Sequence, residues 1–483
     1  MEKQRDTLLQ LLEDYSREGT APFHMPGHKR NTKLAYYLER LGADLDLTEI
    51  PGFDDLHAPE GILANAMAQT ADLYGSDAAF FLVNGSTGGI LAGIRAATSY
   101  GDRVLVARNC HKAVYHALEL CGLEPVFLQP PIIPDFGCAA SLSPEAVKAT
   151  LDTIPEIRLV ILTSPTYEGI LSDVHAICQA AHAHHIPVLV DEAHGAHLGL
   201  VDCFPPGAIS QGADLVIQSV HKTLPSLTQT AVLHVKSNLL SQKEVARQLG
   251  IFQTSSPSYL LMASLDGCVH LLQQHKKELF ADWKQRLLDF EEKIKPLKHI
   301  QILGYGRHKQ VQISEVYGCD PSKLVIGCRN TTLGGIELME QLQKCYHIQL
   351  EMALEHYAVA MTGIGDHAKE MDDLAFALLE LENLYGKNSM QKEPLCLPPM
   401  PQARISPAKA ADCRWKLVSP PKAIGAVCGE FIWAYPPGIP LMIPGEILSR
   451  EWIEHLLSLH QNGIHLIGTR GAVPDRLAVL ELS

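Results

Sequence analysis

The sequence lacks three features that are typical of other classes of protein. None of its 12 cysteines forms a Cys-x-x-Cys pair, which excludes a zinc ribbon and a thioredoxin-type motif. No apolar stretch is long enough to span a membrane, and the charged N-terminus has no signal-peptide core. Basic side chains number 40 against 54 acidic ones, so the net charge is −14 and a general affinity for nucleic acid or anionic membranes is not expected.

Length and composition indicate a globular protein with more than one domain. The 483 residues are too many for a single hydrophobic core, so two or three domains are expected. Hydrophobic residues make up 46% and charged residues 19%, which is typical of a soluble globular chain. Because the cysteines are scattered singly, we predict a cytoplasmic protein with unpaired thiols.

Short apolar stretches alternate with helix-like stretches from residue 63 onward. The predicted strands are 78–85, 103–109, 124–129, 158–165, 186–194, 214–221 and 231–236. The predicted helices between them are 88–99, 112–121, 144–153 and 174–184. Continuous apolar strands that alternate with helices predict an α/β fold with a mostly parallel sheet covered on both faces.

The remaining sequence predicts smaller elements around this large domain. Further helices are expected at 5–16, 258–297 and 336–345, further strands at 311–317 and 323–329, and irregular structure at 19–62. A Pro-rich stretch at 386–407 is typical of a linker or loop. We therefore predict four segments: a helix and loop segment (1–62), the large domain (63–297), a small α/β domain (298–385) and a C-terminal domain (386–483).

Polar residues follow the predicted strands, where ligands bind in open parallel sheets. The first group directly precedes a helix and consists of Asn84, Gly85, Ser86, Thr87 and Gly88. Small and hydroxyl residues at a helix N-terminus present N–H groups to a phosphate. A well-capped helix after a turn is the alternative for this group taken alone.

Four more strand ends carry residues that suit one cofactor. They supply His111, then Thr163, Ser164, Tyr167 and Glu168, then Asp191, His194 and His197, and finally Ser219, His221 and Lys222. A phosphate cradle, an aromatic ring, a buried carboxylate and a lysine are what pyridoxal 5′-phosphate requires. The lysine forms a Schiff base, and the carboxylate keeps the pyridine nitrogen protonated.

Seven motifs resemble the fold-type-I pyridoxal-phosphate decarboxylases of ornithine, lysine and arginine. They are HMPGHKR, VNGSTGG, RNCHKA, SPTYEG, VDEAHGAH, SVHKTLPSLTQ and QTSSPSY, and the likeness extends from about residue 20 to Glu446. The chain resembles the shorter members, without the N-terminal regulator-like domain of the long forms. The resemblance implies a pyridoxal-phosphate-binding large domain with smaller C-terminal α/β domains.

Lys222 is the Schiff-base lysine that the resemblance implies. The chain has other His-Lys pairs, and Lys112 is the serious rival because it also follows a predicted strand. The resemblance makes His111 the residue that stacks on the cofactor ring and Asp191 the partner of the ring nitrogen. It implies cofactor contacts by Gly85, Ser86, Thr87, His111, Asp191, His194, Ser219, His221, Lys222 and Thr254.

Thr254 and His194 are two of the cofactor contacts that the resemblance implies. Thr254 matches a threonine that reaches the phosphate from a partner subunit, although a turn or cap before Pro257 is the alternative. His194 stands where larger members carry a tryptophan near the phenolic oxygen of the cofactor.

His24 and His28 are four residues apart, but Pro26 and Gly27 disfavour a helix between them, so no metal site is predicted.

The resemblance implies decarboxylation of arginine, lysine or ornithine through a quinonoid intermediate. The distal cation of such a substrate needs a carboxylate partner. The candidates are Asp54, Asp55, Glu168, Glu430 and Glu446, with Glu430 first, although each is more often a solvated or capping residue. Partners implied by resemblance are the amino acid and a second copy, in a homodimer or larger assembly with shared active sites.

Two alternatives stay open at the level of sequence. Another fold-type-I enzyme, such as an aminotransferase or an aldolase-like lyase, shares the phosphate cradle, the aspartate and the lysine. A non-catalytic, antizyme-inhibitor-like binding protein is disfavoured by the intact Asp191 and Lys222. The absence of the extra domain favours a role in polyamine biosynthesis over one in acid tolerance.

Overall fold

A computed structural model describes residues 7–31, 33–34, 36–305, 315–386, 397–434 and 438–482. The chain divides into two compact units, each built from two stretches of sequence. The first unit contains residues 1–96 and 189–281, and the second contains residues 97–188 and 282–483. These units divide the chain differently from the four predicted segments, whose boundaries stay a prediction.

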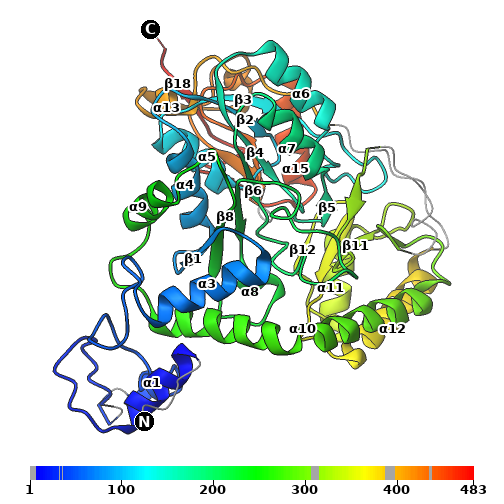
Figure 1. The fold of residues 1–483 in the computed structure, drawn as a ribbon. Coiled ribbons are helices and arrows are strands. Elements are labelled where there is room, and N and C mark those ends of the chain that lie inside the picture. The colour runs from blue at the N-terminus through cyan, green and yellow to red at the C-terminus, as the bar shows by residue number, and fades with distance from the viewer. Residues whose placement is uncertain are drawn as a thin grey trace. The chain divides into compact units, whose positions relative to one another are not determined.

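The first unit holds the N-terminal helices and the strands that lead to Asp191 and Lys222. Its helices are α1 (Leu8–Arg17), α2 (Tyr36–Glu39), α3 (Ile62–Tyr74), α4 (Gly85–Ala97), α8 (Val220–Thr223), α9 (Gln242–Phe252) and the start of α10 (Tyr259–Ile294). Its strands are β1 (Ala78–Leu82), β6 (Val188–Asp191), β7 (Leu215–Gln218) and β8 (Ala231–Val235). Figure 1 shows the blue helix α3 beside β1.

The strands of the first unit lie in the order β1-β8-β7-β6. Strand β8 pairs antiparallel with both β1 and β7, whereas β6 and β7 are parallel. In the parallel pair Asp191 lies opposite Ile217. The carboxyl ends of β6 and β7 therefore meet at one edge, as expected for a ligand-binding edge.

The second unit holds the other parallel strands and the C-terminal elements. Its helices are α5 (Lys112–Leu120), α6 (Pro144–Thr153), α7 (Val174–His182), α11 (Gly335–Tyr346), α12 (Ala368–Tyr385), α13 (Pro407–Ala411), α14 (Pro420–Ala423) and α15 (Arg450–Gln461). Its longer strands are β2 (Arg103–Ala107), β3 (Glu124–Leu128), β4 (Ile157–Thr163), β11 (Lys323–Gly327), β13 (Tyr357–Met361), β14 (Trp415–Val418) and β18 (Leu477–Leu480). Its short strands are β5 (Ile170–Leu171), β9 (Gln301–Ile302), β10 (Gly318–Cys319), β12 (Met352–Ala353), β15 (Ile432–Ala434), β16 (Pro440–Met442) and β17 (Leu466–Gly468).

Strand β2 pairs in parallel with β3 and β4, so the second unit also carries parallel strands. A separate antiparallel sheet has the order β12-β13-β11-β9, and the C-terminal strands form the pairs β14-β18 and β16-β15-β17. The predicted α/β fold with mostly parallel strands in the large domain is confirmed.

Several predicted elements differ at their ends from the observed ones, and two of these differences lie beside the candidate site. The strand predicted for 214–221 ends at Gln218, because Ser219 begins the helical turn α8. Helix α4 begins at Gly85 rather than at Gly88, since Gly85 (φ 68°) turns the chain directly into the helix. Residues 311–314 of the predicted strand 311–317 and residues 387–396 of the predicted linker 386–407 lie outside the described residues.

Candidate active site

Lys222 lies in the helical turn that follows strand β7. The strand is buried along its whole length, and Ser219 leaves the sheet in an extended conformation before α8 begins. The Nζ atom of Lys222 lies 2.9 Å from Nε2 of His194. Because an ammonium group can only donate, a protonated Lys222 requires the lone pair of His194 to lie on Nε2. The two predicted cofactor residues therefore contact each other.

Asp191 ends strand β6 and is 2% exposed. Its Oδ1 atom accepts a hydrogen bond from the N–H of Ala193 at 3.2 Å. Burial raises the pKa of this carboxyl group, while the charge of Lys222 and the Ala193 N–H oppose the rise. A buried carboxylate of this kind is stabilised by a cationic partner, which is what a protonated pyridine nitrogen would provide.

The N-terminus of α4 has the features of an anion cradle. The hydroxyl groups of Ser86 and Ser219 are hydrogen-bonded at 2.5 Å, so the predicted phosphate loop lies at the end of β7. A Cβ atom on Gly89 would lie 2.5 Å from Leu82 Cδ1 and 3.3 Å from Ile217 Cγ2. Glycine thus lets α4 pack closely against the strands, and this packing fixes its N-terminus beside Ser219. The residues fit a phosphate group.

Thr254 and His57 lie next to this cradle within the same chain. The N–H of Thr254 donates to Asn84 Oδ1 at 3.3 Å, and Asn84 directly precedes Gly85. Nε2 of His57 lies 2.8 Å from the carbonyl oxygen of Thr254. The contact of Thr254 with a partner subunit stays a prediction. Thr87 is exposed in the first turn of α4, and its contact with the phosphate stays a prediction.

The two other predicted histidines have defined hydrogen bonds. His221 Nδ1 lies 2.8 Å from the Thr230 carbonyl oxygen, so Nδ1 carries a proton. Burial lowers the pKa of His221, against the effect of the Thr230 carbonyl. His111 is the N-cap of α5, and its Nδ1 accepts from the Ala113 N–H at 3.2 Å. His111 belongs to the second unit, and its stacking on the cofactor stays a prediction.

Asp54 is a capping residue in this structure. Its carboxylate accepts hydrogen bonds from the N–H groups of Glu60, Gly61 and Leu63 at the start of α3. Burial raises the pKa of Asp54, but these backbone hydrogen bonds outweigh that effect and lower it overall. Asp55 accepts from the His57 N–H through Oδ1 at 2.8 Å.

Glu430 and Glu446 are both engaged by partners inside the second unit. Glu430 is fully buried, and its oxygens accept hydrogen bonds from the backbone N–H groups of Arg470, Gly471 and Ala478. These three donors give Glu430, the first choice for the substrate carboxylate, a structural task in the C-terminal strands. The third carboxylate of this unit, Glu168, accepts from the Tyr357 hydroxyl at 2.7 Å.

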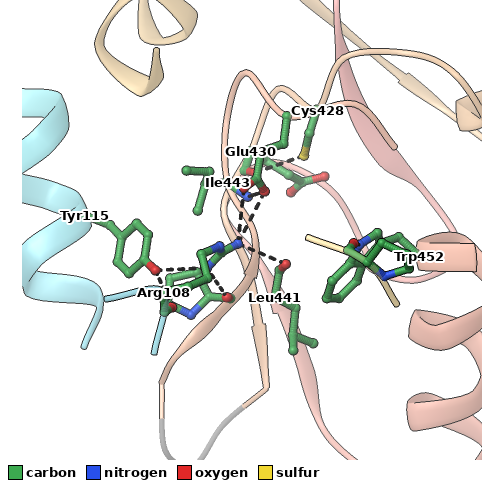
Figure 2. Close-up of polar contacts among 10 residues, drawn as sticks. Arg108, Tyr115, Cys428, Glu430, Leu441, Ile443 and Trp452 are labelled. Carbon is green, nitrogen blue, oxygen red and sulfur yellow. Dashed lines mark hydrogen bonds and ion pairs between the residues drawn. The ribbon is translucent and has the colours of Figure 1, made fainter. Parts of the chain in front are cut away.

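Glu446 pairs with Arg108, a residue that the sequence reasoning passed over. The distance from Arg108 Nη2 to Glu446 Oε2 is 3.3 Å, and both side chains are buried. Figure 2 shows Arg108 at the centre of this network, with hydrogen bonds to the Tyr115 hydroxyl and the Leu441 carbonyl. A charged residue directly after four apolar residues of β2 was the signal in the sequence that pointed to a buried partner.

A second buried network was also missed, and it lies directly beside Asp191. Gln218 donates to Glu192 Oε2 at 2.7 Å, and Glu192 Oε1 accepts from the Ala208 N–H at 2.8 Å. His234 Nε2 lies 3.1 Å from Gln218 Oε1, and Ser76 Oγ lies 3.1 Å from His234 Nδ1. The signal in the sequence was the presence of polar residues, Gln218 and His234, within the otherwise apolar strands β7 and β8.

The comparison with known proteins identifies the family of the chain. Residues 7–332 match the family described as Orn/Lys/Arg decarboxylase, major domain. The chain belongs to this family.

Full-length relatives and solved structures support the membership. An arginine decarboxylase of Halalkalibacterium halodurans is 32% identical over 94% of this chain and 93% of its own. An arginine decarboxylase of Bacillus subtilis is 30% identical over 97% and 96%, respectively. The lysine decarboxylase LdcF of Francisella novicida has a TM-score of 0.80 at 18% identity, covering 99% of this chain and 81% of that structure. The last likeness shows the shared fold.

Membership makes the chain a pyridoxal-phosphate-dependent decarboxylase of basic amino acids. Within the described ranges, no helix is long and apolar enough to cross a membrane. The same part of the chain contains no group of three or more His, Cys, Asp or Glu residues placed to hold a metal ion. The roles of the individual site residues stay predictions.

Proposed function

We propose that the preferred substrate is L-arginine, which is converted to agmatine and CO₂. The observation that carries this proposal is the likeness to relatives named arginine decarboxylase over nearly the whole chain. When bound, pyridoxal phosphate supplies an electron sink for the electron pair of the breaking Cα–carboxylate bond. The side chains described above would bind the cofactor and position the substrate.

We propose that the first unit holds the cofactor through both of its charged ends. Ser86, Ser219 and the N–H groups at the start of α4 would bind the phosphate, because they present hydroxyl and amide donors at a helix N-terminus. Asp191 would bind the protonated ring nitrogen, since its buried carboxylate needs a cation. Gly85, Thr87, His221 and Thr254 are proposed as further phosphate neighbours, and His111 as the stacking residue.

We propose that Lys222 and His194 act together in proton transfer. Their nitrogens are 2.9 Å apart, so a proton on Lys222 Nζ can be shared with His194 Nε2. Burial of His194, at 6% exposure, keeps bulk water away from this pair. Replacement of His194 by alanine is expected to lower kcat more than it raises KM, because the imidazole acts on the proton and not on the distal part of the substrate.

Asp55 is the carboxylate that we propose for the substrate guanidinium. Among the five candidates, Asp54, Glu430 and Glu446 are engaged by backbone donors or by Arg108. Asp55 shares the first unit with Lys222, and the His57 N–H donates to only one of its oxygens. The side chain of His57 contacts Thr254, which in turn contacts Asn84 beside the cradle.

The Asp55 assignment predicts a selective kinetic effect. Asp55→Asn should raise KM for L-arginine about tenfold or more with a smaller change in kcat, because one charge-assisted hydrogen bond is lost. Asp54→Asn is the matched control, since the neighbouring carboxylate caps α3. An unchanged KM in Asp55→Asn would remove Asp55 from the proposal without affecting the assignment of Lys222.

We propose that the chain forms a homodimer or larger assembly through its N-terminal segment. Several large apolar side chains there are exposed in the single chain: Phe23 is 98%, Leu34 77%, Tyr36 75% and Leu41 68% exposed. Such a concentration is typical of a surface that a partner covers. Sedimentation of wild type and Phe23→Ser/Leu34→Ser should show a shift of the double variant toward the monomer.

We propose that the protein is located in the cytoplasm and that it takes part in polyamine biosynthesis. Eleven cysteines in the described part of the chain are thiols that form no disulfide bond, which suits a reducing compartment. Cell fractionation, and measurement of agmatine and putrescine after deletion of the gene, would test the two statements separately.

The deciding experiment offers L-arginine, L-lysine and L-ornithine separately to the cofactor-loaded protein and identifies the amines by mass spectrometry. Agmatine should dominate, and Lys222→Ala should form none. Lys112→Ala is the matched control, because Lys112 also follows a histidine and a strand. Cadaverine or putrescine as the main product would replace arginine by lysine or ornithine. A 2-oxo acid in place of any amine would favour an aminotransferase.

A further inference from the structure

The second unit contains a cavity of about 170 Å³ that none of the proposed cofactor residues lines. For comparison, an apolar cavity of about 150 Å³ can hold benzene. Most of its wall is apolar and includes Leu354, Leu441, Trp452 and Ile464. The wall therefore suits the hydrocarbon part of a small molecule.

Glu168 supplies the negative charge in this wall. The residue is 6% exposed, and the Tyr357 hydroxyl donates to its Oε1 atom at 2.7 Å. Tyr357 is the one hydrogen-bond donor to this carboxylate among the residues that the structure describes. One neutral hydroxyl compensates a buried carboxylate only in part, because a charge out of water needs a counter-charge or several donors.

The other ionisable groups around the cavity leave this charge unbalanced. Arg108 lines the cavity, but its guanidinium is paired with Glu446 and hydrogen-bonded to the carbonyl groups of Pro440 and Leu441. Burial lowers the pKa of His455, against the opposing charge of Glu355, which favours the neutral imidazole. Among the described residues that line the cavity, a positive ligand would therefore meet one carboxylate without a competing cation.

We propose that this cavity binds a primary alkylammonium ion of roughly four to five carbons, with its ammonium group on Glu168 and its chain against the apolar wall. All lining residues belong to the second unit, whereas Asp191 and Lys222 belong to the first. Binding should therefore need neither the cofactor nor Lys222. This inference is independent of the proposed arginine decarboxylation.

The test uses two ligands of equal length and different charge. n-Pentylammonium and 1-pentanol are titrated by calorimetry into the cofactor-loaded protein and into Lys222→Ala. Pentylammonium should bind both proteins at one site per chain and about tenfold or more tighter than the alcohol, because a charged hydrogen bond replaces a neutral one. Cadaverine, titrated alongside, measures how far a second ammonium weakens binding in an apolar cavity.

Two variants test separately the contribution of the Glu168 charge and that of the cavity volume. Glu168→Gln should bind both ligands with similar affinity. Ala139→Leu places a larger side chain in the cavity and should weaken the binding of both ligands. Glu340→Gln, a surface carboxylate of α11 paired with Lys344, is the control for overall charge and should keep the preference for the ammonium ion. Absence of binding, loss of binding in Lys222→Ala, or an unchanged preference in Glu168→Gln would each overturn the proposal.

Discussion

His234 should make the folded protein lose stability as the pH falls. Its imidazole lies in strand β8 at 1% exposure, between the Ser76 hydroxyl and the side-chain amide of Gln218. Gln218 uses its N–H₂ group on Glu192, so its oxygen must accept from His234 Nε2. Nδ1 then accepts from Ser76, and the ring is neutral with both nitrogens satisfied. A second proton would break this arrangement.

The size of the effect follows from the two pKa values. Burial lowers the pKa of His234 from 6.5 to about 3. Between these values the unfolded chain binds a proton that the folded chain does not, so the free energy of unfolding falls as the pH falls from about 6.5 toward 3. Integrated from about pH 7.5 to about pH 5, the loss is about 2 kcal/mol.

Urea unfolding of wild type and His234→Gln at both pH values measures this loss. The variant cannot take up the proton, so its decrease in unfolding free energy should be smaller than that of wild type by about 2 kcal/mol. His185→Gln, which removes a histidine from an exposed turn, serves as the control and should behave as wild type does. Equal decreases in wild type and His234→Gln would refute the reasoning, whatever the stability of the variant at the higher pH.

Three further predictions concern other charged side chains. Arg108→Met leaves the Glu446 carboxylate buried without its cationic partner and should lower the free energy of unfolding by about 3–5 kcal/mol. Adding Glu446→Leu should restore part of this free energy in the same urea assay. Asp54→Ala removes the cap of α3 and should cost about 1–2 kcal/mol, whereas Asp54→Asn should cost less in a thermal melt. Asp191→Asn should weaken cofactor binding about tenfold or more, measured by absorbance titration of the cofactor-free protein; unchanged affinity would contradict the proposed contact with the ring nitrogen.

The sequence predicted several strands well because the signals for them are local. Mostly apolar stretches of four to seven residues form β1, β2, β4, β6, β7 and β8 near the predicted positions. The residues after these runs, such as Asp191 and Lys222, follow from chain order alone, since parallel strands bring their carboxyl ends to one edge. The turn at Ser219 shortened β7 by a few residues without moving Lys222 from that edge.

The substrate carboxylates were harder to predict because their partners are distant in sequence. The backbone donors to Glu430 lie at positions 470, 471 and 478, and Arg108 lies 338 residues from Glu446. A single sequence does not distinguish a buried carboxylate that has such partners from one that binds a ligand. The hydrogen-bond partners separate them, and they leave Asp55 and Glu168 as the carboxylates with the fewest donors.

The network beside Asp191 explains how Asp191 and Lys222, the two central residues of the proposed site, keep their positions. Strands β6 and β7 pair in register at Asp191 and Ile217, and the Glu192 N–H donates to the Ile217 carbonyl. One residue further along each strand, the side chains of Glu192 and Gln218 bond to each other. A slip by one residue would turn each side chain to the opposite face and break this bond. Gln218, whose side-chain oxygen accepts the hydrogen bond from His234, therefore also helps to fix the register from which Asp191 and Lys222 leave the sheet.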